Sequence, residues 1–148
     1  MDAMDRQILQ ILQDEFPLIP APFQAVAGRL GLGEAEVLDR VRKLKEAGVI
    51  RRIGATFNSR ALGFVSTLCA ARVPAERLAS FTAVVNASPF VTHNYRRDHE
   101  YNVWFTVIAP SAAARENFLR EVKEQTGVTD ILDLPAVRTF KIDARFAM

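Results

Sequence analysis

One segment of the chain concentrates the side chains that could do chemistry. The stretch VTHNYRRDHEYNVWFTVIA, residues 91–109, holds both histidines, both tyrosines, the single tryptophan and one of the two adjacent arginine pairs. Arginine binds carboxylates through paired hydrogen bonds, and aromatic rings stack on flat ring systems. Imidazole can ligate iron or transfer a proton near neutral pH. These residue types together indicate a site for a flat, metal-bearing ligand surrounded by carboxylates, such as a carboxylated metallotetrapyrrole, with a solvated hairpin end as the alternative.

The spacing within this segment predicts which side chains share a face of the hairpin. Residues 90–97 and 101–109 have the pattern of two strands, and only DHE separates them, so they are expected to form an antiparallel hairpin. Successive side chains of a strand point to opposite faces. The alternation places on one face Val91, His93, Tyr95 and Arg97, and on the other Thr92, Asn94 and Arg96. His99 lies at the turn, so the segment is expected to wrap the edge of a pocket, with its two arginines serving different carboxylates or different chains.

The elements around the hairpin predict a ferredoxin-like domain. A buried strand is expected over residues 65–73 and a helix over 74–87, and after the hairpin a helix over 111–126 and a strand over 130–142. The order β-α-β-β-α-β is that of the ferredoxin-like fold. Such a sheet has helices on one face only, so its other face needs cover from a second copy or a related chain.

The first part of the chain predicts a winged helix-turn-helix. Apolar spacing favours helices over residues 4–12, 22–30 and 34–47, with the glycines of GLG, residues 31–33, in the turn between the last two. The following GVIRRIGATFN is expected to be a strand or wing. The whole chain is therefore assigned to the α+β class, with a winged helix-turn-helix domain over residues 1–60 and a ferredoxin-like ligand-binding and catalytic domain over residues 61–148.

A helix-turn-helix makes transcriptional regulation the first hypothesis, but the charge order opposes it. The early residues of the second helix in this motif face the bases, and here they include the acids Glu34, Glu36 and Asp39. Binding to DNA depends strongly on attraction to phosphates, which these carboxylates would repel. We therefore do not expect DNA binding and favour a scaffold whose helices pack against a partner.

Composition restricts the other classes of protein. The chain has 148 residues, 49% hydrophobic and 24% charged, which is typical of a soluble globular protein. It shows no signal-peptide layout and no apolar run near the roughly 20 residues of a membrane span, so we expect a cytoplasmic protein without membrane association. The single cysteine, Cys69, lies in an apolar strand and is expected to be a small buried side chain.

The strings THNYRRDHEYNVWFTV, GVIRRIGATFN and LGF together resemble the siroheme decarboxylases, enzyme relatives of the Lrp/AsnC regulators. The resemblance covers essentially the whole chain, and its specific parts are HNYRR and YN-WFT. It implies a carbon–carbon lyase that removes carbon dioxide from two acetate side chains of siroheme, giving 12,18-didecarboxysiroheme for an alternative route to haem or the route to haem d1. It also implies pairing with a paralogous chain as a heterodimer, or a homodimer, and no cofactor beyond the iron of the substrate. A haem- or siroheme-responsive regulator and a non-catalytic subunit stay as alternatives.

The reaction sets what the residues must supply. Loss of carbon dioxide leaves negative charge that spreads into the macrocycle, so the protein has to hold the ring, exclude water and deliver a proton. His93 is the first candidate for proton donor or axial iron ligand, with His99 as the other, and Tyr95 can donate a hydrogen bond or a proton. An arginine on the reacting carboxylate would stabilise the ground state, so Arg96 and Arg97 are assigned to non-reacting carboxylates.

Five further residues complete the predicted substrate site. Tyr101 and Trp104 are expected to support the ring or the core, and Asn94 to contact the substrate. Arg51 and Arg52 add carboxylate contacts or are solvated residues of the wing.

Overall fold

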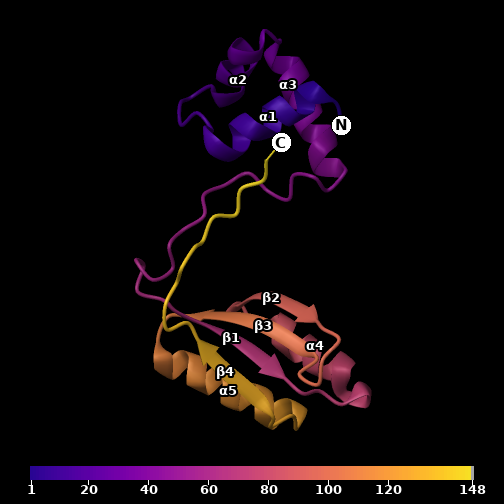
Figure 1. Cartoon of the computed structure of the whole chain (residues 1–148), viewed down its shortest axis with the longest axis vertical. Helices are drawn as coiled ribbons and strands as arrows, with labels where there is room; N and C mark the ends of the chain where they lie inside the picture. The colour runs from indigo at the N-terminus through magenta and orange to yellow at the C-terminus, as the bar shows by residue number, and fades with distance from the viewer. Residues whose placement is uncertain (148) are drawn as a thin grey trace. The chain divides into compact units, whose positions relative to one another are not determined.

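The chain forms two compact units. The computed structural model describes residues 1–147, drawn in Figure 1. Contacts between residues group 1–56 with the described residues from Lys141 onward, and Phe57–Phe140 form the second unit. Gln13 holds the end of the chain in the first unit, since its side chain accepts from Phe146 N at 2.8 Å and donates to Phe146 O at 3.0 Å. The predicted domain boundary at residues 60 and 61 stays a prediction.

Three helices build the first unit, as the sequence predicts. They are α1 (Ala3–Asp14), α2 (Pro22–Leu30) and α3 (Glu34–Glu46). One apolar side of each helix packs into a common core. The fully buried side chains of this core are Ile8, Val26 and Val37. Gly31, with φ of 66°, ends α2 in a left-handed conformation that glycine adopts without strain.

The segment GVIRRIGATFN, expected to be a strand or wing, forms no strand. Val49 N and Ile50 N both bond to Leu44 O, which anchors the start of the segment to α3, but residues 51–64 contain no strand. Apolar side chains there stay open to solvent, with Ile53 44% and Phe57 74% exposed. Local alternation is not enough for a strand, because its backbone groups need a neighbouring strand and residues 51–64 pair with none.

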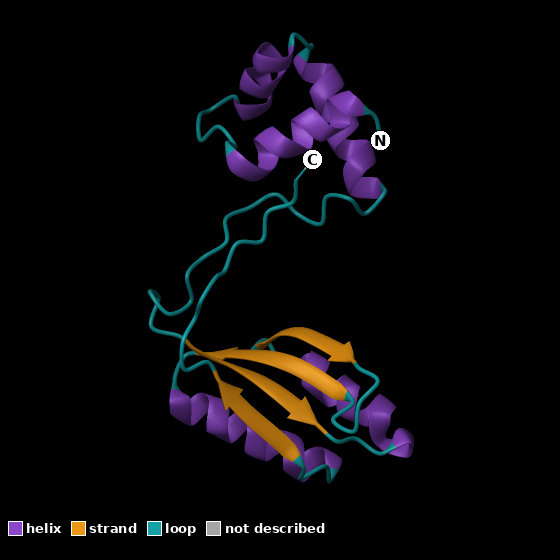
Figure 2. Ribbon diagram, viewed as in Figure 1, coloured by secondary structure: helices purple, strands orange, loops and turns teal. Residues whose placement is uncertain are grey.

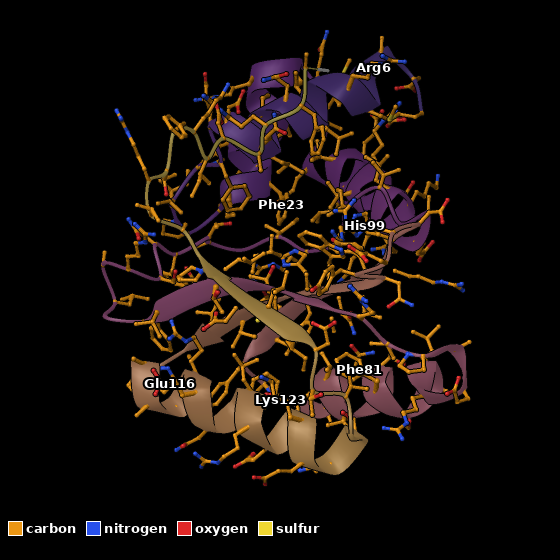
Figure 3. All side chains as sticks on the ribbon, turned by 60° about the horizontal axis from the view of Figure 1, so that its bottom comes forward. Arg6, Phe23, Phe81, His99, Glu116 and Lys123 are labelled. Atoms are coloured by element: carbon orange, nitrogen blue, oxygen red, sulfur yellow. The ribbon has the colours of Figure 1, made fainter. Side chains whose placement is uncertain are left out.

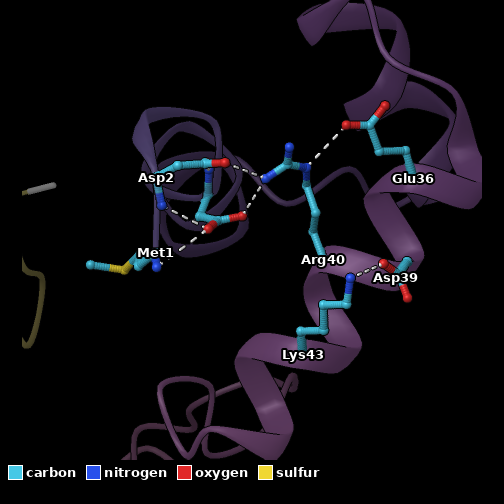
Figure 4. A network of polar contacts seen from close by, with 7 residues as sticks. Met1, Asp2, Glu36, Asp39, Arg40 and Lys43 are labelled. Carbon is cyan, nitrogen blue, oxygen red and sulfur yellow. Dashed lines mark hydrogen bonds and ion pairs between the residues drawn. The ribbon is translucent and has the colours of Figure 1, made fainter.

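An arginine of α3 is held by the start of α1 (Figure 4). Arg40 Nη1 donates to Asp2 Oδ2 and Asp5 Oδ1, each at 2.8 Å, and Arg40 Nε lies 3.1 Å from Glu36 Oε1. Asp2 and Asp5 also cap α1 reciprocally, each side chain accepting from the other's backbone N–H at 2.8 Å. The hydrogen bond from Arg40 lowers the pKa of Asp2 to about 2. The network joins α1 to α3 and neutralises a cation that a DNA-reading helix would present.

The second unit has the ferredoxin-like order that the sequence predicts. Its elements are β1 (Val65–Ala71), η1 (Ala75–Arg77), α4 (Leu78–Ala87), β2 (Val91–Arg96), β3 (Val103–Ala109), α5 (Ala112–Thr126) and β4 (Ile131–Pro135). The four strands pair antiparallel in the order β2-β3-β1-β4. The last strand is shorter than the predicted residues 130–142, since it ends at Pro135, which has no N–H for the ladder.

Both long helices, α4 and α5, cover the same face of this sheet (Figure 2). Phe81 of α4 and Phe105 of β3 are fully buried and meet edge to face with centroids 6.1 Å apart. Cys69 points into the same core with no exposed surface, as expected. The opposite face has no helix of this unit over it. None of the helices among residues 1–147 is long and apolar enough to cross a membrane.

We predict that Asp2→Asn destabilises the first unit near neutral pH. Asparagine can still cap α1, but it loses the charge that faces Arg40. Because folding lowers the pKa of Asp2 from 3.8 to about 2, its stabilisation is present above pH 3.8 and is lost as pH falls through about 2. The free energy of unfolding, measured by urea denaturation with circular dichroism, should be lower in the variant than in the wild type at pH 7 and nearly equal at about pH 2. The same difference at both pH values would contradict this prediction. Asp98→Asn is the charge-matched control.

We also predict that the thiol of Cys69 does not react in the folded protein. Burial, with the Asp133 carboxylate as the next cause, raises the pKa of Cys69 to about 12, so the nucleophilic thiolate is scarce below that pH. Iodoacetamide at pH 8 should label the chain only after unfolding in urea. The double variant Cys69→Ala with Ala83→Cys moves the sole thiol to an exposed position on α4 and should label in the native state. Equal native labelling of both proteins would rule out the assignment.

Candidate functional site

A bulge in β2 decides which side chains share a face of the sheet. Val91 pairs with Val107, but the next paired residue is His93, opposite Thr106, so Thr92 has no partner in the ladder. The extra residue shifts the alternation by one position. Val91 consequently lies on the helical face, and the prediction that it shares a face with His93 is wrong.

We call the face of the sheet that α4 and α5 do not cover the open face. After the bulge, this face carries a row of aromatic side chains, the aromatic row. His93 and Tyr95 stack with ring centroids 6.0 Å apart and an interplanar angle of 23°. Tyr95 pairs with Trp104 of β3, and the guanidinium carbon of Arg97 lies 5.9 Å from the centre of the Trp104 ring. Tyr95 is 52% exposed, so a flat ligand can reach these rings. The structure thus brings together the predicted residues His93, Tyr95, Arg97 and Trp104.

Two predicted substrate-binding residues lie on the other face. Asn94 pairs with the buried Phe105, and its side-chain amide donates to Asn86 of α4 at 2.9 Å. Arg96 pairs with the buried Val103. Both line a hollow beside α4, together with Ala75, Leu78, Ala79, Thr82, Asn86 and Val103. The predicted separation of these two residues from His93 and Tyr95 is confirmed, so the predicted site residues occupy two faces, and the role of each stays a prediction.

The remaining predicted residues lie at the hairpin end and in the first unit. His99 and Tyr101 belong to the loop between β2 and β3, with stacked rings 6.2 Å apart. Figure 3 shows His99 away from the helical side of the sheet, where Phe81, Glu116 and Lys123 lie. Arg51 and Arg52 belong to the first unit, where both are exposed, and their role stays a prediction.

Sequence reasoning missed two residues at the hairpin end. Arg72 Nη2 lies 2.8 Å from Glu100 Oε2, and Arg72 Nε lies 3.2 Å from Asp130 Oδ2. Asp130 Oδ1 also accepts from the hydroxyl of Tyr101 at 3.1 Å. Arg72 follows β1 and Asp130 precedes β4, so the predicted antiparallel neighbours could have placed both beside the hairpin end.

An apolar area adjoins the aromatic row on the open face. Leu68 of β1 pairs with Thr106 and with Leu134, and Leu132 and Leu134 of β4 continue the face. These three leucines are 41%, 38% and 42% exposed. Exposed contiguous apolar side chains are typical of surfaces that bind another molecule.

Residues 1–147 contain no group of three His, Cys, Asp or Glu side chains that could hold a metal ion.

Comparison with known proteins identifies the family. Residues 5–51 match the siroheme decarboxylase NirDL-like HTH domain, and residues 61–141 match the AsnC-like ligand binding domain. The chain is 55% identical over its full 148 residues to the siroheme decarboxylase alpha subunit of Desulfovibrio desulfuricans, of which it covers 85%. The chain belongs to the siroheme decarboxylase family. A second siroheme decarboxylase alpha subunit, from Nitratidesulfovibrio vulgaris, is 51% identical over the full chain, which covers 84% of it.

Solved structures agree with this assignment. The siroheme decarboxylase NirDL superposes with a TM-score of 0.73 at 36% identity, over 98% of this chain and 47% of the NirDL chain. NirDL has also been solved in co-complex with an iron-uroporphyrin III analogue, with a TM-score of 0.71 and 36% identity over 93% of this chain and 47% of that one. An AsnC family transcriptional regulator from Agrobacterium tumefaciens has a TM-score of 0.80 at 27% identity, over 99% and 97% of the two chains. Siroheme decarboxylases and regulators therefore share this fold.

Proposed function

We propose that this chain is a subunit of a siroheme decarboxylase, a carbon–carbon lyase that converts siroheme to 12,18-didecarboxysiroheme by removing carbon dioxide from two acetate side chains. The observation that carries the proposal is the 55% identity, over the full chain, to a siroheme decarboxylase alpha subunit. The product would serve an alternative route to haem or the route to haem d1.

The open face of the sheet offers what the macrocycle requires. The rings of His93, Tyr95 and Trp104 provide an aromatic surface for a flat conjugated ligand. Arg97, at the end of this row, can bind a peripheral carboxylate through two parallel hydrogen bonds. That contact would fix the orientation of the ring while the reacting acetate stays free of a guanidinium.

Each decarboxylation breaks the bond between a carboxyl carbon and the methylene group attached to the macrocycle. The electron pair of that bond spreads into the conjugated ring, carbon dioxide leaves, and a proton converts the methylene group to a methyl group. The substrate supplies the electron sink, so no cofactor beyond its own iron is needed. The protein contributes a dry, oriented site and a proton donor, with His93, His99 and Tyr95 as the candidates.

The exposed leucines of the open face are the proposed binding surface for a partner chain. A related siroheme decarboxylase chain placed over Leu68, Leu132 and Leu134 would bury them and enclose the aromatic row. Relatives named as separate subunits support this arrangement. So does NirDL, whose chain is long enough for a second module of this size. We therefore propose a heterodimer with a paralogous chain, and a second copy of this chain as the alternative.

A regulator role is less well supported. The fold is shared with an AsnC family regulator. However, Arg40 of α3 is occupied by Asp2, Asp5 and Glu36, and Lys43 lies 2.7 Å from Asp39 on the same helix. With four acidic and four basic side chains, α3 has no net positive charge to attract phosphates.

Anaerobic incubation with siroheme tests the proposed reaction directly. The chain, assembled with its paralogous partner, should give two products by mass spectrometry, lighter by one and then two molecules of carbon dioxide. Glu121→Gln, on the exposed side of α5, should behave as the wild type. Unchanged siroheme in the presence of the assembled complex would refute the proposed function.

The two adjacent arginines should differ in their effect on binding. Arg97→Ala removes the guanidinium beside Trp104 and its two hydrogen bonds to a carboxylate, and it should weaken siroheme binding by at least about tenfold, since even one hydrogen bond to a charged group contributes that much. Because Arg96 lies on the helical face, a ligand on the aromatic row would not reach it, contrary to its predicted carboxylate contact, and Arg96→Ala should leave the Kd within about twofold. Absorbance titration measures both values. A larger loss with Arg96→Ala than with Arg97→Ala would show that the ligand lies on the other face.

A further inference from the structure

The hairpin end is braced by residues from three parts of the second unit. Asp130, before β4, accepts from the Tyr101 hydroxyl at 3.1 Å and lies 3.2 Å from Nε of Arg72, which follows β1. The guanidinium carbon of Arg72 also lies 5.1 Å from the centre of the Tyr101 ring. Arg72 N donates to Asp130 O at 3.0 Å, which joins the two supporting segments. Tyr101 is thus held at its ring face and at its hydroxyl.

Tyr101 in turn determines how His99 presents its ring. The backbone N–H of Tyr101 donates to His99 Nδ1 at 3.1 Å, and the two rings stack at an interplanar angle of 23°. The carbonyl of Tyr101 is fixed as well, because it accepts from Trp104 Nε1 at 2.7 Å. A ring nitrogen that accepts a hydrogen bond carries no proton, so neutral His99 carries its proton on Nε2.

This arrangement distinguishes the two histidines. An imidazole that ligates a metal usually donates its second ring N–H to an oxygen, which leaves the lone pair of the other nitrogen for the metal. His99 does not follow this pattern, because its Nδ1 accepts a hydrogen bond instead of donating one and its Nε2 carries the proton. His93 is compatible with the ligand pattern, since its Nδ1 lies 3.1 Å from the Thr92 hydroxyl oxygen, which can accept a hydrogen bond from Nδ1–H.

We propose that Arg72 and Asp130 are positioning residues that hold Tyr101 and thereby keep His99 as an Nε2–H donor to a carboxylate of the bound tetrapyrrole, which leaves the iron to His93. The inference rests on the proposed siroheme site. The contacts of Arg72 and Asp130 with Tyr101, which we call the brace, involve only residues of this chain.

The brace can be tested without substrate. Nitrogen NMR of the ¹⁵N-histidine-labelled chain in its complex should show His99 with Nδ1 unprotonated and Nε2 protonated. Asp130→Ala should convert this pattern to a mixture of both tautomers, and Tyr101→Phe, which removes only the braced hydroxyl, should act in the same direction. Asp130→Asn keeps an oxygen acceptor for that hydroxyl and should retain the wild-type pattern. Asp98→Ala, in the same loop, is the control.

A proton on Nδ1 of His99 in the wild type, or identical spectra for Asp130→Ala and Asp98→Ala, would overturn the proposal.

Kinetics and spectra with siroheme test its consequence. Asp130→Ala should lower kcat/KM about tenfold, the cost of a mispositioned donor to a charged group, and Asp130→Asn should recover most of that loss. The Soret band of bound siroheme should move in His93→Ala and stay in place in His99→Ala. A band that moves only in His99→Ala would overturn the assignment of the iron. If the wild type binds siroheme but releases no carbon dioxide, the proposed function fails, while the NMR comparison still decides the brace.

Discussion

A sheet covered by helices on one face only is the constraint from which the rest of the second unit follows. On the covered face, β1 and β3 contribute small and aromatic side chains that pack against α4 and α5, with Phe81 and Phe105 at the centre. Side chains of a strand point to one face or the other, so every residue that does not face the helices is available for a ligand or a partner. The single unpaired residue in β2, Thr92, therefore has a large effect, since it determines the face of each residue after it.

The open face is chemically divided along the order of its strands. β2 and β3 supply aromatic rings, and Arg97, directly after β2, supplies a guanidinium, whereas β1 and β4 supply leucines. Such a division suits a site enclosed between two related chains, where part of one sheet binds the ligand and the rest binds the neighbour. In the proposed complex, the bound ligand would cover the aromatic row and the neighbouring chain would cover the leucines.

Much of this organisation was predictable from local pattern, and the failures have a common cause. The helices and the ferredoxin-like order follow from apolar spacing, glycines and prolines, which act within a few residues. The bulge at Thr92, the missing strand after α3 and the early end of β4 depend on which backbone groups find partners across the sheet. The aromatic row was therefore predicted with Val91 on the wrong face. Arg72 and Asp130 were missed because they flank strands that are distant in sequence from the hairpin.

The ion pairs of Arg40 limit how the helix-turn-helix unit could be reused. Its α3 has the length and the preceding turn of a recognition helix, yet the arginine at its middle is bound by two carboxylates from the first turn of α1. Freeing Arg40 to contact phosphates would require changes outside α3. The first changes would have to be made at Asp2 and Asp5, where they would also remove the cap of α1, so DNA affinity and the integrity of the unit would have to be redesigned together.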